Sequence, residues 1–259
     1  MPSFDAAYCK IVQYDMAHDH GFTPEQSVES VSFSPVKGSD ELAVIVPPWH
    51  APEWYLRQHA RAQNRLGRSA LTLSLNDHIL SADPYRTIES FGYIADMYEA
   101  AVSEIGQEPT HWQATSLGTS ILMHTVGTKG LPAPSIAFVA PGGDLARSLW
   151  TGLRTQPLRR QLEANGMSEE ALVELWKPLS PIEQASAIKE SNVEMNISFA
   201  DEVIRPDTAF TFAAALSLQN RVSVFVNRHF GHYGTILHHT FLTRMISKSN
   251  IGNSYEHNR

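Results

Sequence analysis

Apolar residues along this chain fall into short continuous runs, separated by longer stretches in which they recur at helical spacing. Short apolar runs ended by Pro, Gly or Asn are typical of strands that are buried on both faces of a sheet. Two further runs, over Tyr8–Tyr14 and Val31–Phe33, favour edge strands. The pattern predicts central strands over Leu42–Val46, Ala70–Leu75, His111–Thr115, Ser135–Ala140, Val193–Phe199 and Arg221–Val226.

The stretches between these runs have the periodicity of amphipathic helices. Two of them are followed by a glycine, Gly67 or Gly106, in the position of a helix C-cap. The predicted helices cover Glu53–Leu66, Arg86–Ile105, Gly118–Val126, Thr208–Leu218 and Thr235–Ile246.

Strands that alternate with helices in this way predict an α/β fold. The connections are expected to be right-handed, which gives a mostly parallel central sheet with helices on both faces. In such sheets the functional groups gather beyond the carboxyl ends of the strands. Candidate chemistry is therefore sought in the loops that follow the predicted strands.

One connection, between the strands ending at Ala140 and starting at Val193, is too long for a simple crossover helix. Inside it, Leu145, Leu149 and Leu153 share one helical face. A second apolar face precedes Pro181. We expect a helical cap over the strand ends, at about residues 144–190 of a single domain spanning 1–259; one crossover helix with irregular flanks is the alternative.

Composition narrows the class of protein. The 259 residues carry a formal net charge of −7, which argues against a nucleic-acid binder that works by neutralising phosphates. The single cysteine, Cys9, excludes a disulfide within the chain and favours the cytoplasm. The sequence shows neither a secretory signal nor an apolar stretch long enough to span a membrane.

Cofactor and metal motifs are missing as well. The glycine-rich nucleotide fingerprints and the H-E-x-x-H zinc motif do not occur. Two pairs of neighbouring histidines, in His18-Asp19-His20 and His238-His239, have no third ligand at a recognisable spacing. We expect a chain that needs no cofactor and no metal.

The segment around Ser116 is the most informative one. It reads Ala114-Thr115-Ser116-Leu117-Gly118, at the point where a predicted strand ends and a helix begins at once. Small residues two before and two after the serine suit a sharp turn that exposes its Oγ above a sheet. Ser116 is therefore a candidate nucleophile, and the Leu117 amide would face an oxyanion formed on it.

In this motif, and in the order in which an acid and a histidine follow it, the chain from about residue 41 to 246 resembles an α/β-hydrolase. The resemblance implies an acid after the next-to-last strand, where Asp201 is the choice and Glu202, then Asp207, are alternatives. It also implies a histidine after the last strand, and Gly231-His232 fits that place. His232 would be the base and Asp201 would orient its ring.

The resemblance further implies a second oxyanion donor in the loop after the strand ending at Val46. Here Pro47 and Pro48 replace the family's usual His-Gly pair, and proline has no N–H to donate. The first available amide is that of Trp49. The motif around Ser116 also departs from the family's usual pattern, since Ala114 stands where Gly is common.

The function implied is a serine hydrolase that cleaves a carboxylic ester or thioester of a small-molecule acyl substrate. Two alternatives stay open: an acyltransferase that uses the same residues, and a non-catalytic binding protein with this fold. We interpret Trp49, Trp54, Trp150 and Trp176 as packing residues, some of which would line an apolar pocket under the cap. The oligomeric state is left open.

Overall fold

The computed structural model describes residues 9–10 and 23–241 of the chain. The predicted edge strand Tyr8–Tyr14 is described only at Cys9 and Lys10, and the predicted final helix only as far as residue 241. The histidine pair around Asp19 lies outside the described residues.

Within the described part of the chain, the strands form one eight-stranded sheet in the order β1-β2-β4-β3-β5-β6-β7-β8. The pairs β1–β2 and β2–β4 are antiparallel, and every other neighbouring pair is parallel. The strands are β1 (Cys9–Lys10), β2 (Val28–Ser34), β3 (Leu42–Val46), β4 (Ser69–Leu75), β5 (Pro109–Thr115), β6 (Ser135–Val139), β7 (Asn192–Ser198) and β8 (Arg221–Asn227).

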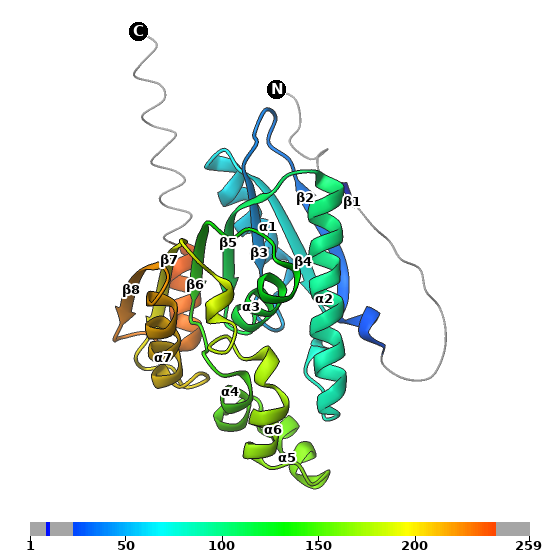
Figure 1. The fold of residues 1–259 in the computed structure, drawn as a ribbon, viewed down its shortest axis with the longest axis vertical. Coiled ribbons are helices and arrows are strands. Elements are labelled where there is room, and N and C mark those ends of the chain that lie inside the picture. Colours follow the sequence, from blue (N-terminus) through cyan, green and yellow to red (C-terminus); the bar gives the residue numbers. More distant parts are fainter. Residues whose placement is uncertain (1–8, 11–22, 242–259) are drawn as a thin grey trace.

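The helices cover both faces of this sheet (Figure 1). A right-handed crossover changes face when the chain reverses its direction across the sheet. The step from β3 to β4 runs one way and the steps from β4 through β8 run the other, so α1 lies on one face and α2, α3 and α7 on the opposite one. These helices are α1 (Glu53–Arg65), α2 (Pro84–Ile105), α3 (Gly118–Lys129) and α7 (Pro206–Ser217), and a further helix spans residues 232–241.

The predicted central strands are thus present with ends shifted by a few residues, and so are the predicted helices as far as the structure describes them. Strand β3, near the sheet centre, is entirely apolar, and each of its residues is buried between helices on the two faces of the sheet. Gly106 has a positive φ of 69° and ends α2 as a left-handed C-cap, as its position predicts. Val31–Phe33 belongs to β2, which is not an edge strand because β1 pairs with its outer side.

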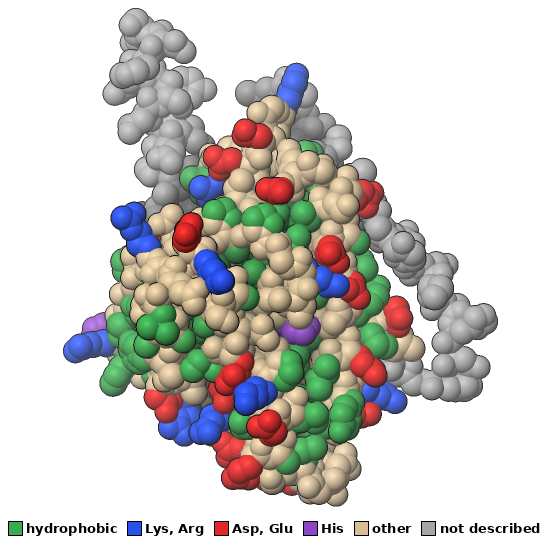
Figure 2. All heavy atoms as spheres, in the orientation of Figure 1, with side chains coloured by type: hydrophobic (Ala, Val, Ile, Leu, Met, Phe, Trp, Pro, Cys, Tyr) green, Lys and Arg blue, Asp and Glu red, His purple; other side chains and the backbone are tan. Residues whose placement is uncertain are grey.

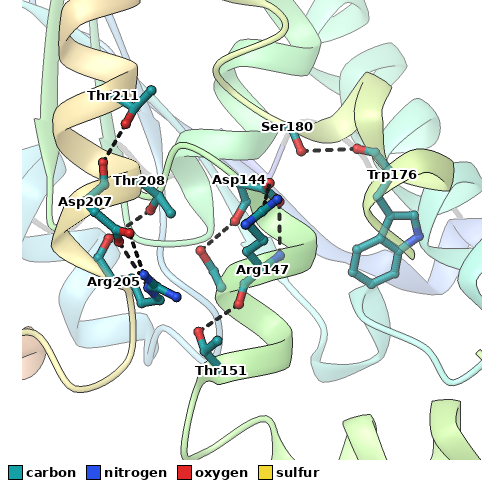
Figure 3. Close-up of polar contacts among 10 residues, drawn as sticks. Asp144, Arg147, Thr151, Trp176, Ser180, Arg205, Asp207, Thr208 and Thr211 are labelled. Atoms are coloured by element: carbon teal, nitrogen blue, oxygen red, sulfur yellow. Dashed lines mark hydrogen bonds and ion pairs between the residues drawn. The ribbon is translucent and has the colours of Figure 1, made fainter. Parts of the chain in front are cut away.

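The long connection between β6 and β7 holds three short helices, α4 (Leu145–Thr151), α5 (Gln156–Ala164) and α6 (Glu169–Leu175). They lie together beyond one end of the sheet (Figure 1). Asp144 caps α4 by accepting a hydrogen bond from the backbone amide of Arg147, and the close-up shows the two side chains paired as well (Figure 3). Leu153 does not share a helical face with Leu145 and Leu149 as the spacing predicts, because α4 ends before it, and its side chain is exposed.

The tryptophans do not all pack as expected. Trp176 is fully buried, and its Nε1 donates to the Pro84 carbonyl at 3.0 Å. Trp54 is 52% exposed, so the packing interpretation is wrong for this residue. It lies at the start of α1, beside rather than on the face that packs against the sheet.

The surface is mixed in character. On the face seen in Figure 2, acidic and basic side chains are interspersed and apolar side chains form small groups between them. No helix in the described residues has the length and apolar character that crossing a bilayer requires.

Candidate active site

Ser116 occupies a sharp turn between β5 and α3. Its φ of 52° lies in the left-handed region, which is uncommon for a residue other than glycine and marks a conformation enforced by its surroundings. The turn is held by the Ser116 amide, which donates to the carbonyl of Val139 on the neighbouring strand at 2.9 Å. The strand-to-helix turn predicted from the sequence is therefore present at this residue.

Gly118 explains why the turn needs small residues. A Cβ built there would lie 2.5 Å from the carbonyl oxygen of Val46 and 2.6 Å from that of Pro47. The backbone after β3 thus packs directly against the first turn of α3. Ala114, by contrast, is buried in β5 between Val46 and Phe138, and its methyl group is accommodated there.

His232 lies within hydrogen-bonding distance of both predicted partners. Its Nε2 is 2.9 Å from Ser116 Oγ, and its Nδ1 is 2.8 Å from Asp201 Oδ2. A carboxylate only accepts hydrogen bonds, so Nδ1 carries the proton and Nε2 is the acceptor for the serine hydroxyl. The side chains of His232 and Asp201 are only 3% and 4% exposed, so bulk water does not compete for these contacts.

The structure separates the three acids that the sequence left as alternatives. Asp201 faces the imidazole, and its Oδ1 is fixed by the backbone amides of Val203 and Ile204 at 2.8 and 2.7 Å. Glu202 points elsewhere: its Oε2 accepts from the His232 amide at 3.1 Å and so caps helix 232–241.

The third acid, Asp207, lies at the start of α7 and has a different partner. Its carboxylate forms two hydrogen bonds with the Arg205 guanidinium, at 3.1 and 2.6 Å (Figure 3). These bonds lower the pKa of Asp207, which is a surface ion pair and takes no part in the site.

Beneath the Ser116 turn lies a buried polar network that the sequence did not suggest. Tyr55 on α1 is hydrogen-bonded to Thr115 at 2.9 Å, and His59 one turn later is 2.6 Å from the amide of Gln113. The other ring nitrogen of His59 lies 3.1 Å from Thr240 Oγ1 on helix 232–241. Burial lowers the pKa of His59 to about 4, so this ring is neutral.

This network joins the strand that leads to Ser116 with the helix that begins at His232. The only sequence signal for it is alternation, since Gln113 and Thr115 point to the same face of β5. Polar residues in a strand would ordinarily be read as exposed. Both are buried here because α1 supplies their partners.

The loop after β3 also contributes to the lining of the site, through Trp49. The indole N–H of Trp49 donates to the carbonyl of Asp77 at 3.1 Å, and the Asp77 carboxylate pairs with His50. Trp49 and Leu117, the two residues expected to supply oxyanion donors, line one cavity of about 70 Å³ together with Ser116. The other lining residues are Leu80, Ser120, Gly142, Leu145, Ser148, Leu149, Thr155, Val203 and Ile204.

Within residues 9–10 and 23–241, no three or more His, Cys, Asp or Glu side chains converge as a metal ion would need. His239 stacks parallel to His59, with ring centroids 6.5 Å apart, and burial lowers its pKa to about 4.

Comparison with known proteins was informative only for the three-dimensional structure. No protein-family model matches the sequence, and no curated protein matches it. Among solved structures, an acetyl xylan esterase from Paenibacillus sp. R4 is similar with a TM-score of 0.63 at 16% identity, over 85% of this chain and 79% of that one.

Two further structures agree with this result. An esterase from Pyrococcus furiosus has a TM-score of 0.57 at 14% identity, over 89% of this chain and 94% of its own. An acylaminoacyl peptidase from Pyrococcus horikoshii has a TM-score of 0.62 at 13% identity, over 85% of this chain but only 38% of its own length. The strand order and these likenesses together show that the chain has the α/β-hydrolase fold.

Proposed function

We propose that this protein is a serine hydrolase that cleaves a carboxylic ester or thioester through an acyl-enzyme. The observation that carries the proposal is the continuous chain of hydrogen bonds from Ser116 through His232 to Asp201, shielded from water at a strained turn. A nucleophile, a base and a group that orients the base are the components that acyl transfer needs.

The chemistry follows from the positions of these atoms. Ser116 Oγ attacks the acyl carbon while its proton passes to His232 Nε2, and the carbonyl oxygen becomes an oxyanion. The oxyanion is stabilised by the backbone amides of Leu117 and Trp49. The bond to the leaving group then breaks, and the leaving atom takes the proton from His232.

The second half of the reaction repeats these steps with water. Water attacks the acyl-enzyme and gives a proton to His232 Nε2. The bond between the acyl carbon and Ser116 Oγ then breaks, Oγ takes that proton back from His232, and the acid leaves. Asp201 stays ionised throughout and stabilises the imidazolium formed in each half. The names of the similar structures, which include esterases, support an ester as the substrate class.

The test is covalent labelling with a fluorophosphonate, which reacts with activated serines. Wild type is expected to label, and Ser116→Ala and His232→Ala are expected not to. Ser90→Ala is the matched control, because Ser90 is a buried serine on α2 outside this site. Labelling that survives Ser116→Ala, or a folded wild type that does not label, would refute the proposal.

Labelling alone does not identify the acyl acceptor. Product analysis with an activated ester, in water alone and with added alcohol, amine or thiol, answers that question. Free acid as the main product under all conditions is expected for a hydrolase. A transferred acyl group as the main product would favour the acyltransferase alternative.

A further inference from the structure

The cavity beside Ser116 is small and mostly apolar. Pockets that bind drug-sized molecules have volumes of about 300–1,000 Å³. This cavity has a volume of about 70 Å³. A space of about 10–15 Å³ holds one water molecule, so the cavity accepts a group of only a few non-hydrogen atoms.

The lining shows which part of an ester enters the cavity. In the tetrahedral intermediate, the leaving atom must lie near His232 Nε2, which protonates it, and the oxyanion must face its amide donors. Leu117 and Trp49 line the cavity, whereas His232 is not among its described lining residues. The cavity therefore extends from Ser116 on the side of the oxyanion donors, which is the side that suits the acyl group.

We propose that this cavity is an acyl-binding subsite that selects short acyl chains, of about two to four carbon atoms. This inference rests on the proposed function and adds the substrate class to it. The alcohol or thiol part of the substrate leaves on the His232 side and is not limited by this cavity.

The far wall of the subsite comes from the long connection between β6 and β7. Leu145 and Leu149 lie one turn apart on α4 and are 6% and 2% exposed. Because Asp144 caps the first turn of α4, the wall is fixed at its base (Figure 3). Ile204 lines the cavity from the loop that also holds Asp201.

Gly142 leaves space in the cavity between α4 and the loop that holds Asp201. A Cβ built at this position would lie 3.0 Å from Ser148 Oγ and 3.3 Å from Ile204 Cγ2. An added methyl group would therefore occupy part of the cavity between α4 and the Asp201 loop. Shortening the side chain at Leu149 should therefore enlarge the cavity, and adding a methyl group at Gly142 should make it smaller.

The experiment measures kcat/KM for p-nitrophenyl acetate, butyrate, hexanoate and octanoate. Wild type is expected to prefer acetate or butyrate, with a fall of about 10- to 200-fold beyond the chain length that fills the cavity. Leu149→Ala should move the optimum to longer chains. Gly142→Ala should reduce the rate with butyrate more than the rate with acetate.

The matched control is Leu122→Ala, which removes the same atoms from a fully buried site on α3 outside the cavity lining. It should lower stability without moving the chain-length optimum. A second series keeps the acetyl group and lengthens the alcohol, from methyl to hexyl acetate. In that series we expect no sharp fall in kcat/KM as the alcohol becomes longer.

The outcomes separate the two proposals. Ser116-dependent hydrolysis with a preference for octanoate, or an optimum that folded Leu149→Ala and Gly142→Ala both leave unchanged, would overturn the acyl subsite and leave the hydrolase intact. A cut-off in the alcohol series that Leu149→Ala removes would assign the cavity to the leaving group instead. No Ser116-dependent hydrolysis of any ester would refute the proposed function itself, and the subsite with it.

Discussion

Replacing Gly118 with alanine tests how closely the loop after β3 supports the turn at Ser116. The new Cβ would meet the carbonyl oxygens of Val46 and Pro47 at 2.5 and 2.6 Å, where ordinary contact begins near 3.4 Å. Both atoms belong to the backbone, and Val46 is paired with Ala114 of β5 in the sheet. The clash therefore cannot be relieved by rotating a side chain.

Overpacking of this kind costs about 1–3 kcal/mol of folding free energy. The loop that must retreat leads to Trp49, so one wall of the cavity is expected to move away from Ser116. A displacement of about 1 Å at a catalytic centre costs roughly a hundredfold in rate. We expect Gly118→Ala to lose both stability and at least that much labelling rate.

The assay combines urea unfolding with the rate of fluorophosphonate labelling. Gly92→Ala is the control, because Gly92 is inside α2 with nothing within 4 Å of its built Cβ, and alanine there should stabilise by about 0.5–1 kcal/mol. If Gly118→Ala unfolds at the wild-type urea concentration and labels at the wild-type rate, the reasoning about this contact is wrong.

Two further predictions concern the acids and the buried histidine. Asp201→Asn should slow labelling by about ten-thousand-fold, whereas Glu202→Gln, which keeps an acceptor for the His232 amide, should stay within about fivefold; equal losses would contradict the assignment. The pKa of His59 is lowered from 6.5 to about 4, so the unfolded chain binds a proton that the folded chain rejects, and stability present above pH 6.5 is lost as the pH falls towards 4. From pH 7 to pH 5 this costs about 2 kcal/mol in urea unfolding, and His59→Gln should reduce the slope; an unchanged slope would show that His59 does not titrate in this way.

Most of the fold could be predicted from local pattern. The central strands are apolar runs that helices cover on both faces, and a few consecutive residues are enough to recognise such a run. The strand-to-helix turn at Ser116 was predictable for the same reason, because it depends on small neighbours at fixed offsets. The small residues around Ser116 are close to it along the chain, so a single sequence is enough to locate the turn.

The assignment among the acids could not be made from local pattern alone. Asp201 and Glu202 are adjacent, and both carboxylates contact His232, one at its ring and the other at its amide. Which of them meets the ring depends on the direction of the turn that Val203 and Ile204 complete. That direction is set by packing between distant segments, which a single sequence does not show.

The buried network was missed for a related reason. His59 and Gln113 are polar, and polar residues are exposed in most proteins unless a partner is present. Their partners come from other elements, and Thr240 is far away along the chain. A similar limit explains the error at Trp54, since an aromatic residue near the start of a helix is buried only if a neighbouring segment covers it.

The order of the three aligned side chains along the chain has a consequence for protein synthesis. A ribosome that has released the chain as far as β7 has supplied Ser116 but not Asp201, and His232 follows only after β8. Every nascent chain therefore passes through a long period in which the serine turn can form without its hydrogen-bonding partner. The hydrogen-bonded arrangement of the three side chains can therefore be completed only late in translation.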